Sequence, residues 1–156
     1  MISDKIDKLG LKLPDIPEPI GSYLPSICIR DMIFISGQLP MVDGKLLYKG
    51  KLGRDISIEQ GYESARICAL NALSIVKKEL GDLDKIKQII KISGFVNCTD
   101  DFTNHPQVIN GASDLFAMIF NNIGKHSRIA IGTNSLPLNS PVEIDVLFQS
   151  LWYNLK

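Results

Sequence analysis

The sequence predicts an α+β fold in which a mixed β-sheet carries two α-helices on one face. Two stretches with helical periodicity are separated by one β-branched stretch, and this order produces βαβ-like crossovers. The first β-rich runs surround Arg30-Asp31, which predicts an antiparallel hairpin. The 156 residues are 45% hydrophobic and 22% charged, a composition typical of one packed domain.

The amino-terminal part is expected to wrap the surface of this domain. Residues 2 to 9 are expected to form a short helix, and four prolines between residues 14 and 25 then impose extended or turning backbone. The hairpin strands span residues 26 to 36. After them, Gly37 permits close backbone approach and Pro40 removes a ladder donor, so backbone groups here are candidates for ligand contact. A simple turn at the end of the strand is the alternative.

The clearest helix follows a tight turn at Asp43-Gly44 and a short returning strand. Ser57 and Gln60 are spaced as a capping box, and Gly81 is expected to close the helix. Its apolar positions recur at spacings of three and four: Tyr62, Ala65, Ala69, Ala72, Leu73, Val76 and Leu80. This alanine-rich face suits close packing against a sheet.

The second half predicts a strand, a helix and two final strands. Residues 86 to 98 are β-branched, which indicates a long strand, with a bulge expected at Gly94. A second helix is expected to start near Pro106 and to end before Gly124. Its inward positions are Val108, Ile109, Ala112, Leu115, Phe116 and Ile119. The final strands are expected over residues 128 to 133 and 142 to 152.

The last predicted strand also bears on assembly. Valine, leucine, isoleucine and phenylalanine are denser in residues 142 to 152 than one buried face requires. The sheet face that the helices leave open is therefore expected to pack on other copies of the chain, in a homo-oligomer.

Composition argues against several functional classes. The chain has 17 basic and 17 acidic residues, so no overall positive field draws it to nucleic acid or to an anionic membrane. Aromatic residues make up 7% and provide no obvious stacking platform for bases. No apolar stretch approaches the ~20 residues of a membrane span, and the amino terminus lacks the apolar core of a signal peptide. We therefore expect a cytoplasmic protein with no membrane partner and no nucleic acid partner.

The cysteines and histidines do not predict a metal site. Cys28, Cys68 and Cys98 are too far apart in sequence for a zinc or redox motif, and we interpret them as small buried hydrophobes. His105 and His126 do not stand at metal-ligand spacing with each other or with a cysteine. We expect a surface or capping role for both histidines.

Three residues are candidates for small-ligand chemistry. Arg128 opens an apolar strand, and its planar guanidinium can bind a carboxylate through two hydrogen bonds; an arginine paired with a local acid is the alternative. Glu143 shares one strand face with Asp145, and both could simply face solvent. Asn110 precedes Gly111 inside a predicted helix. Because both are poor helix formers, the pair indicates either a functional side chain or close helix packing through the glycine.

Five separated segments resemble one family, in matching order and approximate spacing over residues 19 to 148. They are Pro19-Ile20-Gly21-Ser22-Tyr23, Ile35-Ser36-Gly37-Gln38-Leu39-Pro40, Val108-Ile109-Asn110, Ser127-Arg128-Ile129-Ala130, and Leu136-Pro137 with Val142-Glu143-Ile144. Each segment alone is a weak signal, but five in register are specific. The chain resembles the YjgF/RidA (reactive intermediate deaminase) family, in a divergent branch formerly named endoribonuclease L-PSP-like.

The resemblance implies a chorismate-mutase-like fold with three subunits that associate through their sheets and form ligand clefts between neighbours. It implies one domain over residues 1 to 156, with an amino-terminal extension over 1 to 18 and a core over 19 to 150. The family's best-known activity is hydrolysis of reactive 2-imino or enamine acids to 2-oxo acids and ammonia, without a metal or organic cofactor.

The implied site combines carboxylate binding with placement of a water molecule. Arg128 corresponds to the family arginine that binds the substrate carboxylate, and Glu143 to a carboxylate that orients water or shuttles a proton. The other substrate-binding positions correspond to Tyr23, Ser36, Gly37 and Asn110. Because an imine carbon is already electrophilic, positioning is the main catalytic task.

Departures from the deaminase pattern leave two alternatives open. Ala130 stands where imine deaminases often have cysteine, which removes a polar contact, and both the amino-terminal extension and the segment from Phe102 to Asn110 are longer. One alternative is a non-catalytic pocket that binds or senses a small metabolite. The other is the ribonuclease or translation-inhibitor activity attributed to some family members.

Overall fold

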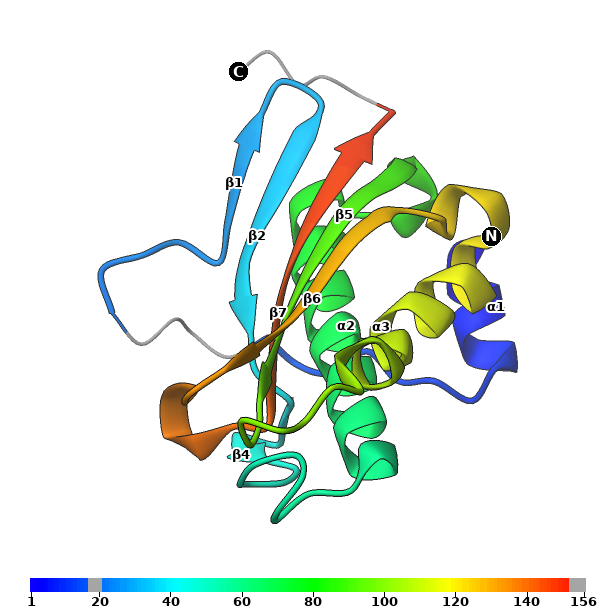
Figure 1. Ribbon diagram of the computed structural model, residues 1–156. Helices are drawn as coiled ribbons and strands as arrows, with labels where there is room; N and C mark the ends of the chain where they lie inside the picture. Colours follow the sequence, from blue (N-terminus) through cyan, green and yellow to red (C-terminus); the bar gives the residue numbers. More distant parts are fainter. Residues whose placement is uncertain (17–20, 152–156) are drawn as a thin grey trace.

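A five-stranded β-sheet forms the centre of the molecule, with α2 and α3 on one face (Figure 1). The computed structural model describes residues 1–16 and 21–151. The elements are α1 (Ile2–Lys8), β1 (Ser26–Ile29), β2 (Met32–Gln38), β3 (Met41–Val42), β4 (Lys45–Leu46), α2 (Ile58–Leu80), β5 (Ile86–Asn97), α3 (His105–Phe120), β6 (Ser127–Thr133) and β7 (Val142–Ser150). Single 3₁₀ turns cover Leu83–Lys85, Asn121–Gly124 and Pro137–Asn139. The predicted α+β class is confirmed.

The sheet is mixed, as the order of helices and strands predicts. Its strands follow the order β1-β2-β7-β5-β6, in which β5 and β6 are parallel and the other neighbours are antiparallel. The parallel pair is joined through α3, the expected crossover. The predicted hairpin of β1 and β2 turns at Arg30, whose φ is 55°. Asp43-Gly44 forms the turn between β3 and β4, with φ angles of 49° and 75°.

Helix α2 begins and ends where the sequence predicts. The Gln60 backbone N–H donates to Ser57 Oγ at 3.2 Å, and the Ser57 N–H donates to Gln60 Oε1 at 2.9 Å. This capping box satisfies two otherwise free donors, and such a cap stabilises a helix by about 1 kcal/mol. Gly81 ends the helix with a left-handed φ of 75°.

Helix α3 packs closely on α2 through a glycine. A Cβ at Gly111 would overlap the backbone carbonyl of Tyr62, so only glycine lets the two helices approach this closely. The predicted inward residues of α3 are all buried: Val108, Ile109, Ala112, Leu115, Phe116 and Ile119. The close-packing interpretation of Gly111 is therefore confirmed.

The bulge expected at Gly94 is wrong. Gly94 pairs in regular register with Ala130 of β6 and Ile144 of β7, and the shifts in the β5–β7 ladder lie within residues 86–91. The glycine serves packing instead, because the Ile109 side chain occupies the space that a Cβ would need.

The cysteines and the end of the last strand differ in part from what the sequence predicts. Cys68 and Cys98 are buried as interpreted, but Cys28 is exposed because β1 is an edge strand. The Cys28 thiol faces Glu79 with an Sγ–Oε2 distance of 3.9 Å. The last described strand ends at Ser150, and Trp152, expected at its end, lies outside the described residues, as do Pro19 and Ile20.

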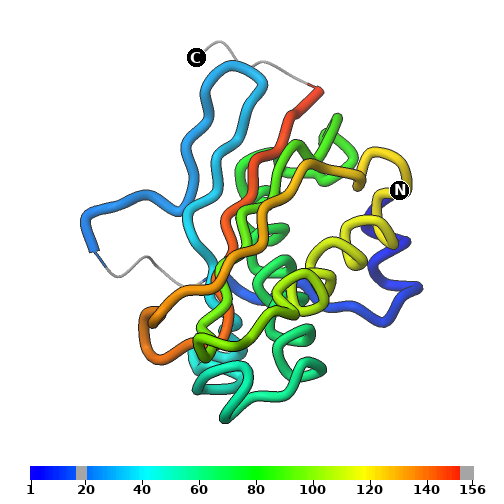
Figure 2. The backbone as a smooth tube through the Cα atoms, viewed as in Figure 1, coloured from blue at the N-terminus to red at the C-terminus, as the bar shows by residue number. Residues whose placement is uncertain are grey.

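The second face of the sheet carries several exposed hydrophobic side chains and lacks a helix in the described part of the chain. Along β7, buried residues that face the helices alternate with partly exposed ones. The exposed hydrophobic residues of this open face are Ile27, Ile29, Phe34, Ile129 and Ile131, which are 40–57% exposed. Figure 2 shows α2 and α3 gathered on the opposite side. Among the described helices, none is long and apolar enough to span a membrane.

Candidate functional site

Arg128 lies at an edge of the sheet, between β6 and α3. It pairs in parallel register with Ile92, which is fully buried toward the helices, so the Arg128 side chain is on the helix-covered side. Its Nη1 donates to Asn110 Oδ1 at 2.8 Å and to Ser113 Oγ at 3.1 Å. The structure therefore joins two predicted site residues, Arg128 and Asn110, and adds Ser113.

These contacts determine which part of the Arg128 guanidinium is available to a ligand. A guanidinium Nη atom carries two hydrogens, and Asn110 and Ser113 use both hydrogens of Nη1. Both partners are neutral. Within residues 1–16 and 21–151, Arg128 makes no salt bridge. The edge formed by Nε and Nη2 can thus bind a carboxylate side-on through two hydrogen bonds.

His126 contacts Ser113 and thereby extends the hydrogen-bond network of Arg128. Its Nε2 lies 3.0 Å from Ser113 Oγ, and its Nδ1 lies 2.7 Å from the carbonyl oxygen of Gly124. The ring meets Phe116 edge to face, with centroids 6.2 Å apart. Burial lowers the pKa of His126, and the positive charge of Arg128 lowers it further, against the hydrogen bond to Gly124, which raises it. His126 is therefore expected to be neutral at pH 7.

A second group of predicted residues meets where β2 and β7 pair. The β2–β7 register shifts between Ile35 and Gln38, and this irregularity contains Gly37. The Glu143 carboxylate lies over Gly37, where the Cβ of any other residue would overlap Glu143 Oε1. Burial raises the pKa of Glu143, and the neighbouring charge of Asp145 raises it further. A close approach thus occurs at Gly37, but it is made by the half-buried Glu143 side chain. Ligand contact with the Gly37 backbone stays a prediction.

Ser36 and Tyr23 extend this second group. The Ser36 hydroxyl donates to the carbonyl of Leu24 at 2.6 Å, and its backbone N–H donates to Pro25 at 3.0 Å. These hydrogen bonds fix the segment that contains Tyr23 against β2. The Tyr23 side chain is 53% exposed. Tyr23 and Gly37 line the same cavity of about 320 Å³. The cavity's apolar walls come from Ile16, Pro25, Leu39, Met41, Ile75 and Leu138, and Asn71 and Ser74 of α2 add polar groups.

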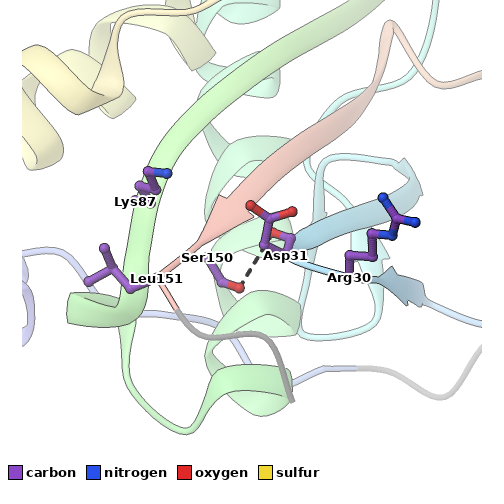
Figure 3. A pocket seen from close by; sticks show the side chains of 5 residues that line it. All are labelled: Arg30, Asp31, Lys87, Ser150 and Leu151. Atoms are coloured by element: carbon purple, nitrogen blue, oxygen red, sulfur yellow. Dashed lines mark hydrogen bonds between the residues drawn. The ribbon is translucent and has the colours of Figure 1, made fainter. Parts of the chain in front are cut away.

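A separate hollow of about 380 Å³ lies at the other end of the sheet (Figure 3). It is lined by Arg30, Asp31, Lys87, Ser150 and Leu151. Its acid is already engaged, because Asp31 Oδ2 accepts from Gln149 at 2.7 Å, and this hydrogen bond lowers the Asp31 pKa. No predicted site residue lines this hollow, so the candidate site lies elsewhere.

The two groups of predicted residues do not meet within one chain. Glu143 is paired with Phe95, and Arg128 with Ile92, three residues away along β5. Because side chains alternate along a strand, Glu143 is on the open face while Arg128 is on the helix-covered side. Strand β5 also separates β6 from β7, which adds roughly 10 Å at the usual strand spacing. A small ligand cannot touch both residues of the same chain.

Comparison with known proteins identifies the family. The model of the family described as "YjgF/chorismate mutase-like, putative endoribonuclease" matches residues 3–151. The chain belongs to this family. Protein TCP17 of Trypanosoma cruzi is 37% identical over 149 residues, which are 95% of this chain and 93% of that protein. A RutC family protein of Aquifex aeolicus is 24% identical over 140 residues, 88% and 95% of the two chains.

Solved structures similar to this chain differ in how closely they match. A protein of unknown function from Agrobacterium tumefaciens has a TM-score of 0.89 at 39% identity, covering 97% of this chain and 92% of its own. A "putative endoribonuclease" from Shewanella oneidensis has a TM-score of 0.92 at 35% identity, with 96% and 99% coverage. The YjgF gene product of Escherichia coli has a TM-score of 0.63 at 20% identity, with 88% and 96% coverage, and shares the fold. The backbone is thus closer to the first two proteins.

The contacts around Arg128 include two residues that the sequence did not point to. Ser113 and His126 were not predicted as site residues, and His126 was expected to have a surface or capping role. The available signal was the spacing of Asn110 and Ser113, which puts both on one face of α3. Ala130, two residues after Arg128, is partly buried against the core and offers no polar side-chain atom there.

Proposed function

We propose that this YjgF-family protein hydrolyses small reactive 2-imino or enamine acids to 2-oxo acids and ammonia, in a cleft between two copies of a homotrimer. The observation that carries the proposal is the state of Arg128. Its guanidinium is partly buried, neutral groups hold its Nη1, and the described residues give it no acidic partner. A positive charge held in this way is suited to an anionic ligand, and the free edge matches a carboxylate.

Glu143 supplies the group that a hydrolysis needs. The oxygen of water bonds to the electrophilic imine carbon while the Glu143 carboxylate accepts a proton from that water. Glu143 then gives this proton to the nitrogen, which has taken the C=N π electrons, and a neutral carbinolamine forms. In a second transfer Glu143 accepts the carbinol O–H proton and passes it to the nitrogen as the C–N bond breaks. A 2-oxo acid and ammonia leave, and Glu143 is again a carboxylate. The raised pKa of Glu143 makes it a stronger base than an exposed glutamate. No metal or organic cofactor takes part.

A second copy is needed because Arg128 and Glu143 are on opposite sides of one sheet. The open face that carries Glu143 is apolar around Phe34, Ile129 and Ile131, and a surface of this kind favours association. In the proposed trimer, the Gly37–Glu143 group of one copy meets the Arg128–Asn110 group of its neighbour. The cavity beside Tyr23 and Gly37 then accepts the substrate's side chain.

The test is ammonia release from freshly generated 2-iminopropionate and 2-iminobutyrate. We expect acceleration over buffer by the wild-type protein and a fall in kcat/KM of at least about 100-fold in Arg128→Ala, as for loss of one partner of a charged pair. The matched control is Arg30→Ala, which removes an arginine from the other hollow and should leave the rate unchanged. The absence of acceleration with several amino-acid-derived imines would contradict the proposal.

One observation favours a binding protein as the second candidate. Ala130 removes a polar group beside Arg128, which leaves the grip on a carboxylate intact but reduces the chemistry available next to it. Calorimetry with 2-oxobutyrate separates the two functions. Tight binding that requires Arg128, without any imine turnover, would establish a non-catalytic metabolite-binding protein.

The family description and the Shewanella relative's name also include endoribonuclease. The balanced charge of this chain, 17 basic and 17 acidic residues, argues against a polyanion groove. RNA cleavage that survives purification and is lost in Arg128→Ala would make this the function instead.

A further inference from the structure

We infer that His126 is a positioning residue for the ligand-binding arginine, acting through the Ser113 hydroxyl. The inference rests on the proposed role of Arg128 in binding a carboxylate. Its basis is the chain of hydrogen bonds that runs from the Gly124 carbonyl through His126 and Ser113 to Arg128.

The direction of each hydrogen bond in this chain follows from the chemistry of its ends. A carbonyl oxygen can only accept, so His126 Nδ1 carries the proton and donates to Gly124. In the neutral ring, Nε2 is then an acceptor, and the Ser113 hydroxyl must donate to it. At the other end, Arg128 Nη1 can only donate. Ser113 therefore gives its proton to His126 and accepts from Arg128.

Because Ser113 donates to His126, His126 orients the hydroxyl that accepts the hydrogen bond from Arg128. A helical serine without another partner tends to donate to the carbonyl four residues earlier, which here is that of Ile109. Loss of the His126 acceptor would free Ser113 to rotate in this way and would weaken its hold on Nη1. Asn110 alone would then fix the guanidinium plane, and the Nε–Nη2 edge would be less well aimed at the carboxylate.

The groups around His126 are consistent with a role in positioning. From α3, Ser113 and Phe116 face the ring; from the 3₁₀ turn, the Gly124 carbonyl fixes its tautomer; from β6, Arg128 is the charged group that acts on it. The positive charge of Arg128 disfavours a second positive charge on His126. The neutral acceptor form that Ser113 needs is thus the form that the surroundings favour.

The decisive experiment compares two replacements of His126 in the full chain, with 2-oxobutyrate as the probe. His126→Phe keeps a ring against Phe116 but removes the acceptor, and we expect its Kd to rise on the order of 10-fold. His126→Gln can place Oε1 where Nε2 stands, and we expect it to restore most of the affinity. In the imine assay, His126→Phe should raise KM more than it lowers kcat.

A double-mutant cycle and a spectrum of the wild-type protein complete the test. In a Ser113→Ala background, His126→Phe should have no further effect, because the connecting hydroxyl is already absent. Nitrogen-15 NMR of wild-type His126 should show the Nδ1–H tautomer; an Nε2–H ring would overturn the inference without any variant. Equal loss in His126→Phe and His126→Gln, or no loss in either, would also overturn it.

The outcomes separate this inference from the proposed function. If Arg128→Ala abolishes binding while His126→Phe binds normally, only the role of His126 is wrong. If the wild type does not bind 2-oxobutyrate, or if Arg128→Ala binds as the wild type does, the carboxylate grip itself is wrong and the inference is wrong with it.

Discussion

At the residue scale, the structure adds a contact with Arg128 to the role predicted for Asn110. The sequence predicted it as a substrate-binding residue, and its Oδ1 accepts a hydrogen bond from Arg128 at 2.8 Å. Asn110 therefore holds the arginine for which we propose ligand binding. The neutral amide matters, because it orients the guanidinium without cancelling its charge.

The substitution Asn110→Asp tests the need for a neutral partner. A carboxylate in place of the amide would pair with Arg128 and compete with the ligand's carboxylate, so we expect binding of 2-oxobutyrate to fall at least about 10-fold. Thermal stability should be maintained, because the new pair is favourable. Calorimetry and thermal unfolding measure the two effects, and unchanged affinity would show that the Arg128 charge is not what the ligand binds.

Glu143→Gln should separate activity from stability. Burial raises the Glu143 pKa in the folded protein, so ionising this residue opposes folding once the pH exceeds its unfolded value, and stability is lost as the pH rises through the folded pKa. The glutamine variant should therefore melt at a higher temperature at pH 7 and lose kcat by about 100-fold or more. The matched control is Asp145→Asn on the same strand face.

The proposed role of Glu143 also predicts how imine hydrolysis by the wild-type protein depends on pH. If Glu143 is the base, kcat/KM should fall on the acid side with a midpoint above the 4.5 typical of glutamate. This acid limb should be absent from any residual activity of Glu143→Gln. A limb of the same midpoint in that variant would assign it to another group.

At the element scale, the contact of α2 with α3 places Asn110 and Ser113 opposite Arg128. Gly111 allows this contact because the Tyr62 carbonyl lies where a Cβ would be. Helix propensity alone predicts that alanine stabilises this position by up to about 1 kcal/mol. The structure predicts instead that alanine at this position destabilises the protein.

We expect Gly111→Ala to lower the free energy of unfolding by about 1–3 kcal/mol, because the helices must separate to admit the methyl group. The control is Met118→Ala, on the exposed side of α3, which should change stability by no more than about 0.5 kcal/mol. Denaturant unfolding measures both. Stabilisation by Gly111→Ala would show that the contact with α2 is looser than described.

At the scale of the whole molecule, the proposed cleft depends on assembly. Ile129 is 45% exposed on the open face and Met118 is 46% exposed on α3. We expect sedimentation of the wild type to give three times the chain mass, and Ile129→Asp to shift this toward the monomer with loss of imine hydrolysis. Met118→Asp should remain a trimer. An active monomer would contradict the need for two copies.

Much of the fold could be predicted from sequence because its signals are local. The Ser57–Gln60 capping box, the Gly81 helix end and the Asp43-Gly44 turn depend on residues within a few positions, and all three are confirmed. Gly94 shows the limit. The sequence around a strand glycine looks the same whether the glycine forms a bulge or makes room for a packed side chain. At Gly94 that side chain is Ile109, which is distant in sequence.

The candidate site could likewise be predicted only in part from the sequence. The sequence by itself determined the residue types and the strand alternation, and hence that Glu143 and Asp145 share a face. Only the tertiary structure decided that Arg128 and Glu143 are on opposite sides of the sheet, that Asn110 and Ser113 hold Nη1, and that His126 stands behind Ser113. These relations depend on which face of each strand packs against the helices and on the path of α3 between β5 and β6. Both are determined by contacts between residues that are far apart in the sequence.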